Sequence, residues 1–320
     1  MTRALLLLAV LCGVASADPD KGVDERARVD VAPAGHAFKQ LAIDNPLGDV
    51  RIEGYDGTAI RIETRKHAPD EDTLDRLRVS LVPNPDGTVR ITTTADPSRE
   101  SKPVPRSSVR IDLIIRAPRG AHVDASIVAG KLEVENMDGG GELDAASGTI
   151  HVKNLSGELV THSVSGTTSL AQVFGSVDAA TVSADVDLDS INGERLVAST
   201  STRGAIAGRR VRSRDIELTT TDGRIALEAE SALHGHIMVA SLRGDLDVHL
   251  HRHGAIVVRG HGVKVDLGAQ VASKTSGGYA PGGQADGWVE TTFGQLSTDS
   301  GPALVELRSR YGAVQFAIVQ

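Results

Sequence analysis

Histidine and glutamate side chains recur on neighbouring segments in the second half of the chain, and their types and spacing suit metal chemistry. The segment GDLDVHLHRHG begins at Gly244, and its Leu and Val residues alternate with acidic residues and histidines. Such alternation predicts a strand that turns the imidazoles of His249 and His251 to one outward face. Imidazole and carboxylate groups on one rigid face are good ligands for zinc or another divalent transition metal.

The glutamates come from the preceding segment of the same kind. Aligning Gly223 with Gly244 places Glu228 and Glu230 beside the histidines, and aligning Gly235 with Gly254 stacks a further histidine pair. We therefore expect a candidate metal site made by His234, His249, His251, His253, Glu228 and Glu230. The alternative is structural, because exposed strand positions need polar residues and Glu–His pairs are ordinary cross-strand partners.

No catalytic motif stands out elsewhere. The sequence has no Walker A loop, dinucleotide fingerprint, HExxH, G-x-S-x-G elbow or cysteine nucleophile in the expected mature chain. We expect neither catalytic residues nor a cofactor.

Regularly spaced glycines predict the elements that position these side chains. It recurs at every ninth position over one stretch and returns after a single gap, at Gly130, Gly139, Gly148, Gly157, Gly166, Gly175 and Gly193. Blocks such as GTIHVKNLS combine a short alternating strand with a polar residue and Gly, which is typical of a corner. Repeats of this length leave no room for a helix and predict a stacked architecture.

Alternate blocks differ, so the structural period is twice nine. The seventh position carries Asn136, Asn154 and Gln172 in one series, but small residues in the other. We therefore expect an all-β, single-stack β-solenoid with two unlike corners per coil and about 18–21 residues per coil. Stacked coils would bring those amides into a ladder of hydrogen bonds.

The chain divides into four regions by composition. Residues 1–17 have a basic start, an apolar run and an A-x-A ending, as in a secretory signal peptide cleaved before Asp18, and no later segment could span a membrane. Residues 18–32 read as a polar lead-in, and 33–119 as short half-exposed strands that cap the solenoid. Within 33–119, Asn84–Gly87 is expected to form a hairpin turn, Asp70–Leu77 a helical turn and Asp96–Ser107 a loop. The solenoid takes residues 120–320, with a Gly-rich loop at 273–287 and closing strands after it.

The first cap strands and the repeats carry a family resemblance. LAIDNPLGDVRIEGYDGTAIRIETRKHA, followed by repeats such as SGTIHVKNLSGELVTHSVSG, resembles the bacterial putative-adhesin domain family, an exported β-solenoid domain of unknown function. The likeness runs roughly from residue 38 to the end. It implies an envelope location and a binding or scaffolding role, and it supplies no catalytic residues.

Composition narrows the function further. The formal net charge is −8, so nucleic acid is not expected as a partner. Aromatic residues make up 2% of the chain, which disfavours the aromatic platforms of a β-helix carbohydrate-active enzyme. We expect a non-catalytic exported protein, periplasmic or surface-located, whose partner is a protein or envelope component. The carbohydrate-active enzyme and a His-rich protein that binds divalent metal stay as alternatives.

Overall fold

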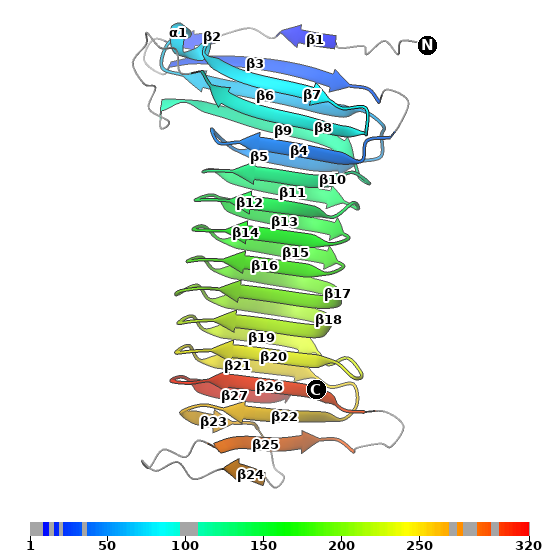
Figure 1. The fold of residues 1–320 in the computed structure, drawn as a ribbon, viewed down its shortest axis with the longest axis vertical. Coiled ribbons are helices and arrows are strands. Elements are labelled where there is room, and N and C mark those ends of the chain that lie inside the picture. Colours follow the sequence, from blue (N-terminus) through cyan, green and yellow to red (C-terminus); the bar gives the residue numbers. More distant parts are fainter. Residues whose placement is uncertain are drawn as a thin grey trace. The chain divides into compact units, whose positions relative to one another are not determined.

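The structure, a computed structural model, describes residues 9–12, 16–18, 22–33, 37–96, 108–268, 274–277, 287–295 and 301–319. These residues form two compact units, Met1–Gly166 and Thr167–Gln320, each built almost wholly from strands (Figure 1). The boundary falls inside the region 120–320 that the sequence assigns to one solenoid. No helix in the described ranges has the length and apolar character needed to cross a bilayer.

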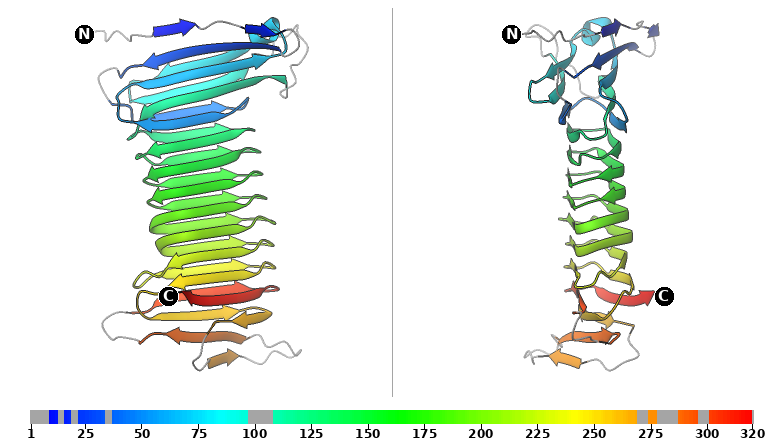
Figure 2. Two further views of the ribbon diagram at one scale, coloured as in Figure 1. Left: turned by 180° about the vertical axis from the view of Figure 1, so that it is seen from behind. Right: turned by 90° about the vertical axis from the view of Figure 1, so that its right-hand side faces the viewer.

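The first unit consists of two layers of strands (Figure 2, right). One sheet runs, in spatial order, through β3 (Gly22–Val31), β6 (Ile60–Ala68), β9 (Arg110–Pro118), β5 (Val50–Tyr55), β11 (Lys131–Met137) and β13 (Thr149–Ser156). The other runs through β7 (Leu77–Pro83), β8 (Thr88–Ala95), β4 (Gln40–Asn45), β10 (His122–Ile127), β12 (Gly141–Ala145) and β14 (Leu159–Ser163). Strand β4 pairs in parallel with β10, and β5 pairs in parallel with β11. Both sheets therefore continue without a break past residue 120, where the sequence predicts the boundary between the cap and the solenoid.

The polar lead-in predicted at 18–32 is wrong for most of its length, because Gly22–Val31 form the ten-residue strand β3. Its charged residues alternate with Val and Ala, and β6 supplies both the backbone partners and opposite charges. Lys66 Nζ lies 3.1 Å from Glu25 Oε2, for example. The short strands β1 (Ala9–Cys12) and β2 (Ser16–Asp18) pair antiparallel with β3.

The local turns of the first unit follow the sequence. The expected hairpin joins β7 to β8, with Gly87 at φ +93° and its N–H donating to the Asn84 carbonyl. The expected helical turn is α1 (Glu71–Leu74), where the Asp70 carboxylate caps the N-terminus by accepting from the Thr73 N–H. The loop expected at 96–107 lies outside the described residues apart from its first.

The second unit also has two sheets. One contains β15 (Thr168–Phe174), the first parts of β17 (Val186–Thr200) and β18 (Ile206–Thr220), then β19 (Ile225–Glu230), β21 (Leu246–His251), β27 (Ala313–Val319) and β23 (Lys264–Asp266). The other contains β16 (Val177–Thr181), the remainders of β17 and β18, then β20 (His236–Ser241), β26 (Ala303–Ser309), β22 (Ile256–His261), β25 (Gly287–Phe293) and β24 (Lys274–Gly277). Most of the expected Gly-rich loop at 273–287 lies outside the described residues.

Three strands are expected to close the solenoid, and the first of them, β25, does lie at its end, paired with β22, whereas β26 and β27 do not. Strand β26 pairs in parallel with β20 on one side and with β22 on the other, and β27 fits between β21 and β23 (Figure 1). The last coil in sequence is therefore inserted between two earlier coils. Its corner, Ser309 to Gly312, repeats the Ser241 to Gly244 corner on which it stacks.

The 18-to-21-residue coil is confirmed, and so is part of its amide ladder. Asn154 Nδ2 donates to Asn136 Oδ1 at 2.8 Å across 18 residues. In the second unit, paired residues are 20 apart between β17 and β18 and 21 apart between β19 and β21. The seventh-position residues of both units share a left-handed backbone, at Asn136, Asn154, Gln172, Ser190 and Arg210. Asparagine tolerates this conformation better than most residues, so the amides form the corner as well as the ladder.

At the opposite corner, glycine is required by crowding. A Cβ placed on Gly223 would lie 1.8 Å from the Gly204 carbonyl oxygen, and one on Gly244 would lie 1.7 Å from the Gly223 oxygen. Neither residue has a positive φ. A buried hydroxyl closes both of these corners. Thr220 Oγ1 accepts from the Gly223 N–H and donates to the Gly204 carbonyl, and Ser241 Oγ accepts from the Gly244 N–H.

We predict that Gly223→Ala lowers the free energy of unfolding by about 1–3 kcal/mol, because the added methyl overpacks a backbone contact that cannot move away. Chemical denaturation of the purified protein measures the change. Gly120→Ala is the matched control, since no atom lies within 4 Å of its added Cβ, and it should leave stability nearly unchanged. Equal effects of the two substitutions would contradict the crowding argument.

Candidate functional site

The strand register predicted for the histidine-rich patch is confirmed. Strands β19 and β21 pair in parallel with Glu228 opposite His249 and Glu230 opposite His251. The side-chain contacts run diagonally, however. His251 Nε2 lies 3.4 Å from Glu228 Oε1, and His253 Nε2 lies 3.3 Å from Glu230 Oε2. The patch is thus a set of separate imidazole–carboxylate pairs.

Two neighbouring residues, Asp247 and Arg212, contact the remaining side chains of this patch. His249 Nε2 lies 2.9 Å from Asp247 Oδ1, and Arg212 Nε donates to Glu230 Oε1 at 2.6 Å. Partial burial raises the pKa of the Glu230 carboxyl, but the hydrogen bond and positive charge of Arg212 outweigh this and leave the pKa below its ordinary value. A guanidinium on a ligand carboxylate repels a metal cation and competes for the same oxygens.

His234 lies apart from the strand pairs. It occupies the corner before β20 in a left-handed conformation, with φ +57°. Because β26 lies between β20 and β22, the strands that follow His234 and His253 do not pair with each other. The structure therefore does not bring the six predicted ligands together as one group, and metal binding by this patch stays a prediction.

The histidine patch borders an open hollow of about 420 Å³. The small residues Gly208 and Ala226 on neighbouring strands line part of this space, together with Glu228, Asp247 and His249. The hollow gives the patch room for a small ligand, with carboxylate and imidazole groups at its wall.

A second set of polar residues lies on the outward face of β4, β10, β12 and β14 in the first unit, which we call the acidic face. Two columns cross these strands. In one, Asp124 pairs with Glu142, and in the other Asp144 lies between Ser126 and His162. Asp44 extends the second column by pairing with Ser126.

The acidic face has no counter-charge of its own. Among the residues that the structure describes, no Lys or Arg forms an ion pair with any of its four carboxylates. Instead, Gln40 donates a hydrogen bond to Asp124, and His162 lies beside Asp144. The other sheet of the same unit differs, because its outward carboxylates are paired with cations in Arg51–Glu135, Lys131–Glu133, Arg110–Asp112 and Arg116–Glu53. One face is neutralised internally and the other is left negative.

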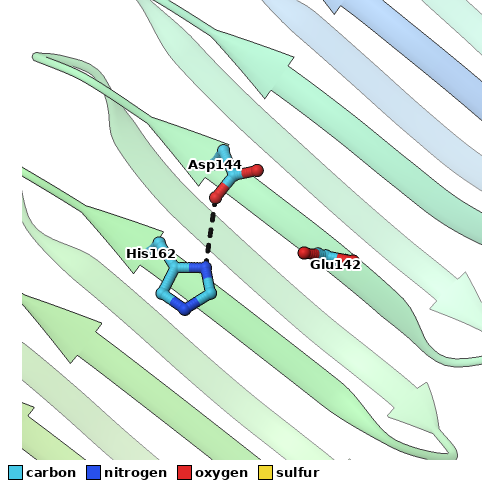
Figure 3. A group of neighbouring side chains, drawn as sticks. All are labelled: Glu142, Asp144 and His162. Atoms are coloured by element: carbon cyan, nitrogen blue, oxygen red, sulfur yellow. Dashed lines mark hydrogen bonds and ion pairs between the residues drawn. The ribbon is translucent and has the colours of Figure 1, made fainter.

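Three side chains of the acidic face gather on its last two strands, β12 and β14 (Figure 3). Glu142, Asp144 and His162 each offer a ligand atom within 4.8 Å of the others, and no other three His, Cys, Asp or Glu residues within the described ranges are grouped in this way. His162 Nδ1 lies 3.2 Å from Asp144 Oδ1. Sequence reasoning missed this group because it searched the segment densest in histidine. The signal was nevertheless present, since Asp144 and His162 are one 18-residue period apart.

Two parallel sheets, coils of 18 to 21 residues and polar columns on rigid outward faces define a β-solenoid domain. The chain belongs to the Toastrack DUF4097 family, whose model matches residues 38–278. The resemblance noted in the sequence is therefore confirmed.

Comparison with solved structures finds bacterial proteins of low sequence identity. A putative adhesin from Bacteroides fragilis is 11% identical, with 91% of this chain and 97% of that chain covered and a TM-score of 0.41. A putative adhesin from Parabacteroides merdae is 11% identical, with coverages of 92% and 96% and a TM-score of 0.36. A putative lipid binding protein from Parabacteroides distasonis is 11% identical, with coverages of 72% and 91% and a TM-score of 0.39. Comparison with curated proteins found no match.

The Arg212–Glu230 pair makes a pH-dependent contribution to stability. Because the pKa of Glu230 is lowered in the folded state, the contribution is present above its ordinary value of 4.5 and is lost as the pH falls through the folded pKa. We predict that Arg212→Gln costs up to about 1 kcal/mol at pH 7 and less at pH 3, where more of the Glu230 carboxyl is protonated. Urea denaturation at both pH values measures the difference. A cost that is equal at pH 7 and pH 3 would contradict an ionic origin.

Proposed function

We propose that the protein is a non-catalytic, exported envelope protein that works as an adhesin-like binding surface or scaffold, and that the acidic face is its binding surface. The observation that carries this proposal is the negative charge of that face, whose carboxylates have no Lys or Arg partner among the described residues. On the other sheet of the same unit, the outward carboxylates form ion pairs with Lys and Arg. Charge left unpaired on a rigid surface favours association with a positively charged partner.

The geometry of the face supports recognition rather than turnover. Its side chains project from consecutive parallel strands, so the main chain holds their spacing at that of the sheet, about 4.8 Å from strand to strand. Preorganised groups lose little conformational freedom when a partner binds. The partner is a protein or envelope component that presents cationic groups.

Export is supported by the N-terminal sequence. Arg3 precedes a short apolar run that ends in Ala15-Ser16-Ala17, the pattern of a cleaved secretory signal. Cleavage before Asp18 would release the chain into the periplasm or to the cell surface.

We predict that neutralising the acidic face weakens binding to envelope fractions. The variant Asp124→Asn/Glu142→Gln/Asp144→Asn should bind isolated bacterial envelopes at least tenfold more weakly than the unmodified protein, since attraction to cationic groups is lost. Sedimentation with envelopes at low and moderate salt measures this. The control is Glu133→Gln/Glu135→Gln on the other sheet, whose carboxylates already have cation partners. Equal binding by both variants would refute the assignment of the acidic face.

We also predict that the full chain is processed and exported when expressed in a bacterium. The mature protein should begin at Asp18 and appear in the periplasmic or surface fraction, as read by N-terminal sequencing and cell fractionation. An unprocessed chain in the cytoplasm would contradict export while leaving the binding measurement intact.

A further inference from the structure

The group on β12 and β14 of the acidic face combines the ligand types that divalent transition metals prefer. His162 supplies an imidazole nitrogen, and Glu142 and Asp144 supply carboxylate oxygens. Calcium and magnesium favour all-oxygen sets, whereas a mixed nitrogen and oxygen set suits zinc and its neighbours. The donor chemistry therefore points to a zinc-like ion.

The backbone places the three donors with little freedom. Asp144 and His162 are direct partners in the parallel pairing of β12 with β14, and Glu142 is two residues before Asp144 on the same face of β12. Ligands at about 2.0–2.2 Å from a tetrahedral zinc ion are about 3.5 Å apart. Side chains that already lie within 4.8 Å of one another need only small rotations to reach that arrangement.

The surrounding charge also favours a cation. Asp124 pairs with Glu142 on the adjoining strand, which adds a further carboxylate to the field. No Lys or Arg within the described ranges pairs with any of the three donors, whereas Arg212 occupies Glu230 in the histidine patch of the second unit. A metal ion at the acidic face gains Coulomb attraction without displacing a bound guanidinium.

Exposure determines what kind of site this is. The Asp144 and His162 side chains are 46% and 53% exposed, so an ion held there keeps coordination positions open to solvent. Structural zinc sites close the fourth position with protein, whereas open ones leave it for water or an external ligand. An ion in this position could be contacted directly by a group from another molecule.

We propose that Glu142, Asp144 and His162 form an open binding site for a divalent transition metal ion of the zinc type on the outward face of β12 and β14. This deepens the proposed function, because it names a cation as a ligand of the acidic face. It is independently testable, because a metal titration requires no envelope partner.

The test is isothermal titration of the metal-free, full-length protein with ZnCl₂ at neutral pH, with CaCl₂ as the comparison ion. We expect one zinc ion to bind more tightly than calcium. His162→Gln and Asp144→Asn should each lower zinc affinity at least tenfold, and thermal unfolding should show that both exposed substitutions leave the protein folded.

The matched control removes the other histidines, as His249→Gln/His251→Gln/His253→Gln, and should leave the zinc affinity within twofold of the unmodified protein. Loss of zinc binding in this control, with binding intact in His162→Gln, would overturn the proposal and move the site to the histidine patch. Failure of the unmodified protein to bind zinc would overturn it outright. A protein that binds zinc at the acidic face yet ignores envelopes would instead refute only the proposed function.

Discussion

Close contact between the backbones of successive coils is the constraint on which the rest of each unit depends. In a parallel stack, every coil donates hydrogen bonds to its neighbours and accepts hydrogen bonds from them. The corners of successive coils must therefore lie as close together as their strands do. The oxygen of Gly223 lies where a side chain on Gly244 would begin, and the same holds between Gly204 and Gly223. At Gly223 and Gly244, glycine is needed because no side chain fits. At the other corner, Asn136 and Asn154 adopt the left-handed conformation in which glycine is usually found.

Chemistry on the outer faces follows from the same stacking. Once the corners set the register, residues one period apart become neighbours whether or not they interact favourably. At β19 and β21 this neighbourhood yields carboxylates already engaged by Arg212 and by histidines. At β12 and β14 it brings Glu142, Asp144 and His162 together with no cation paired to them among the described residues. Similar residue types thus give a neutralised surface in one place and a charged one in another.

Sequence periodicity was enough to predict the coil, the two unlike corners and the neighbours of His249 and His251. It failed where pairing is set by segments far away in the chain. The residues around Glu25 look like a polar lead-in until β6 supplies Lys66 as a partner. Likewise, aligning Gly235 with Gly254 assumes that consecutive repeats are adjacent, and the insertion of β26 breaks that assumption.

The sequence holds one indication of this insertion, because Ser309 and Gly312 have the same spacing as Ser241 and Gly244, on which they stack. Its meaning depended on long-range order that local patterns do not encode. The acidic face was missed for a related reason. Asp124, Glu142 and Asp144 meet through the pairing of β10 with β12, but Asp44 joins them only through the pairing of β4 with β10, which are far apart in the sequence.

The inserted coil also bears on how the second unit is built during synthesis. Strands β22 and β23 are synthesised before β26 and β27. In the finished unit, however, β22 pairs with β26 and β23 pairs with β27. Until residues 303–319 arrive, β20 and β21 present unpaired edges, and unpaired parallel edges invite association with other chains. The pairing of β20 and β21 is therefore completed only by residues 303–319, which are the last of the described residues to be synthesised.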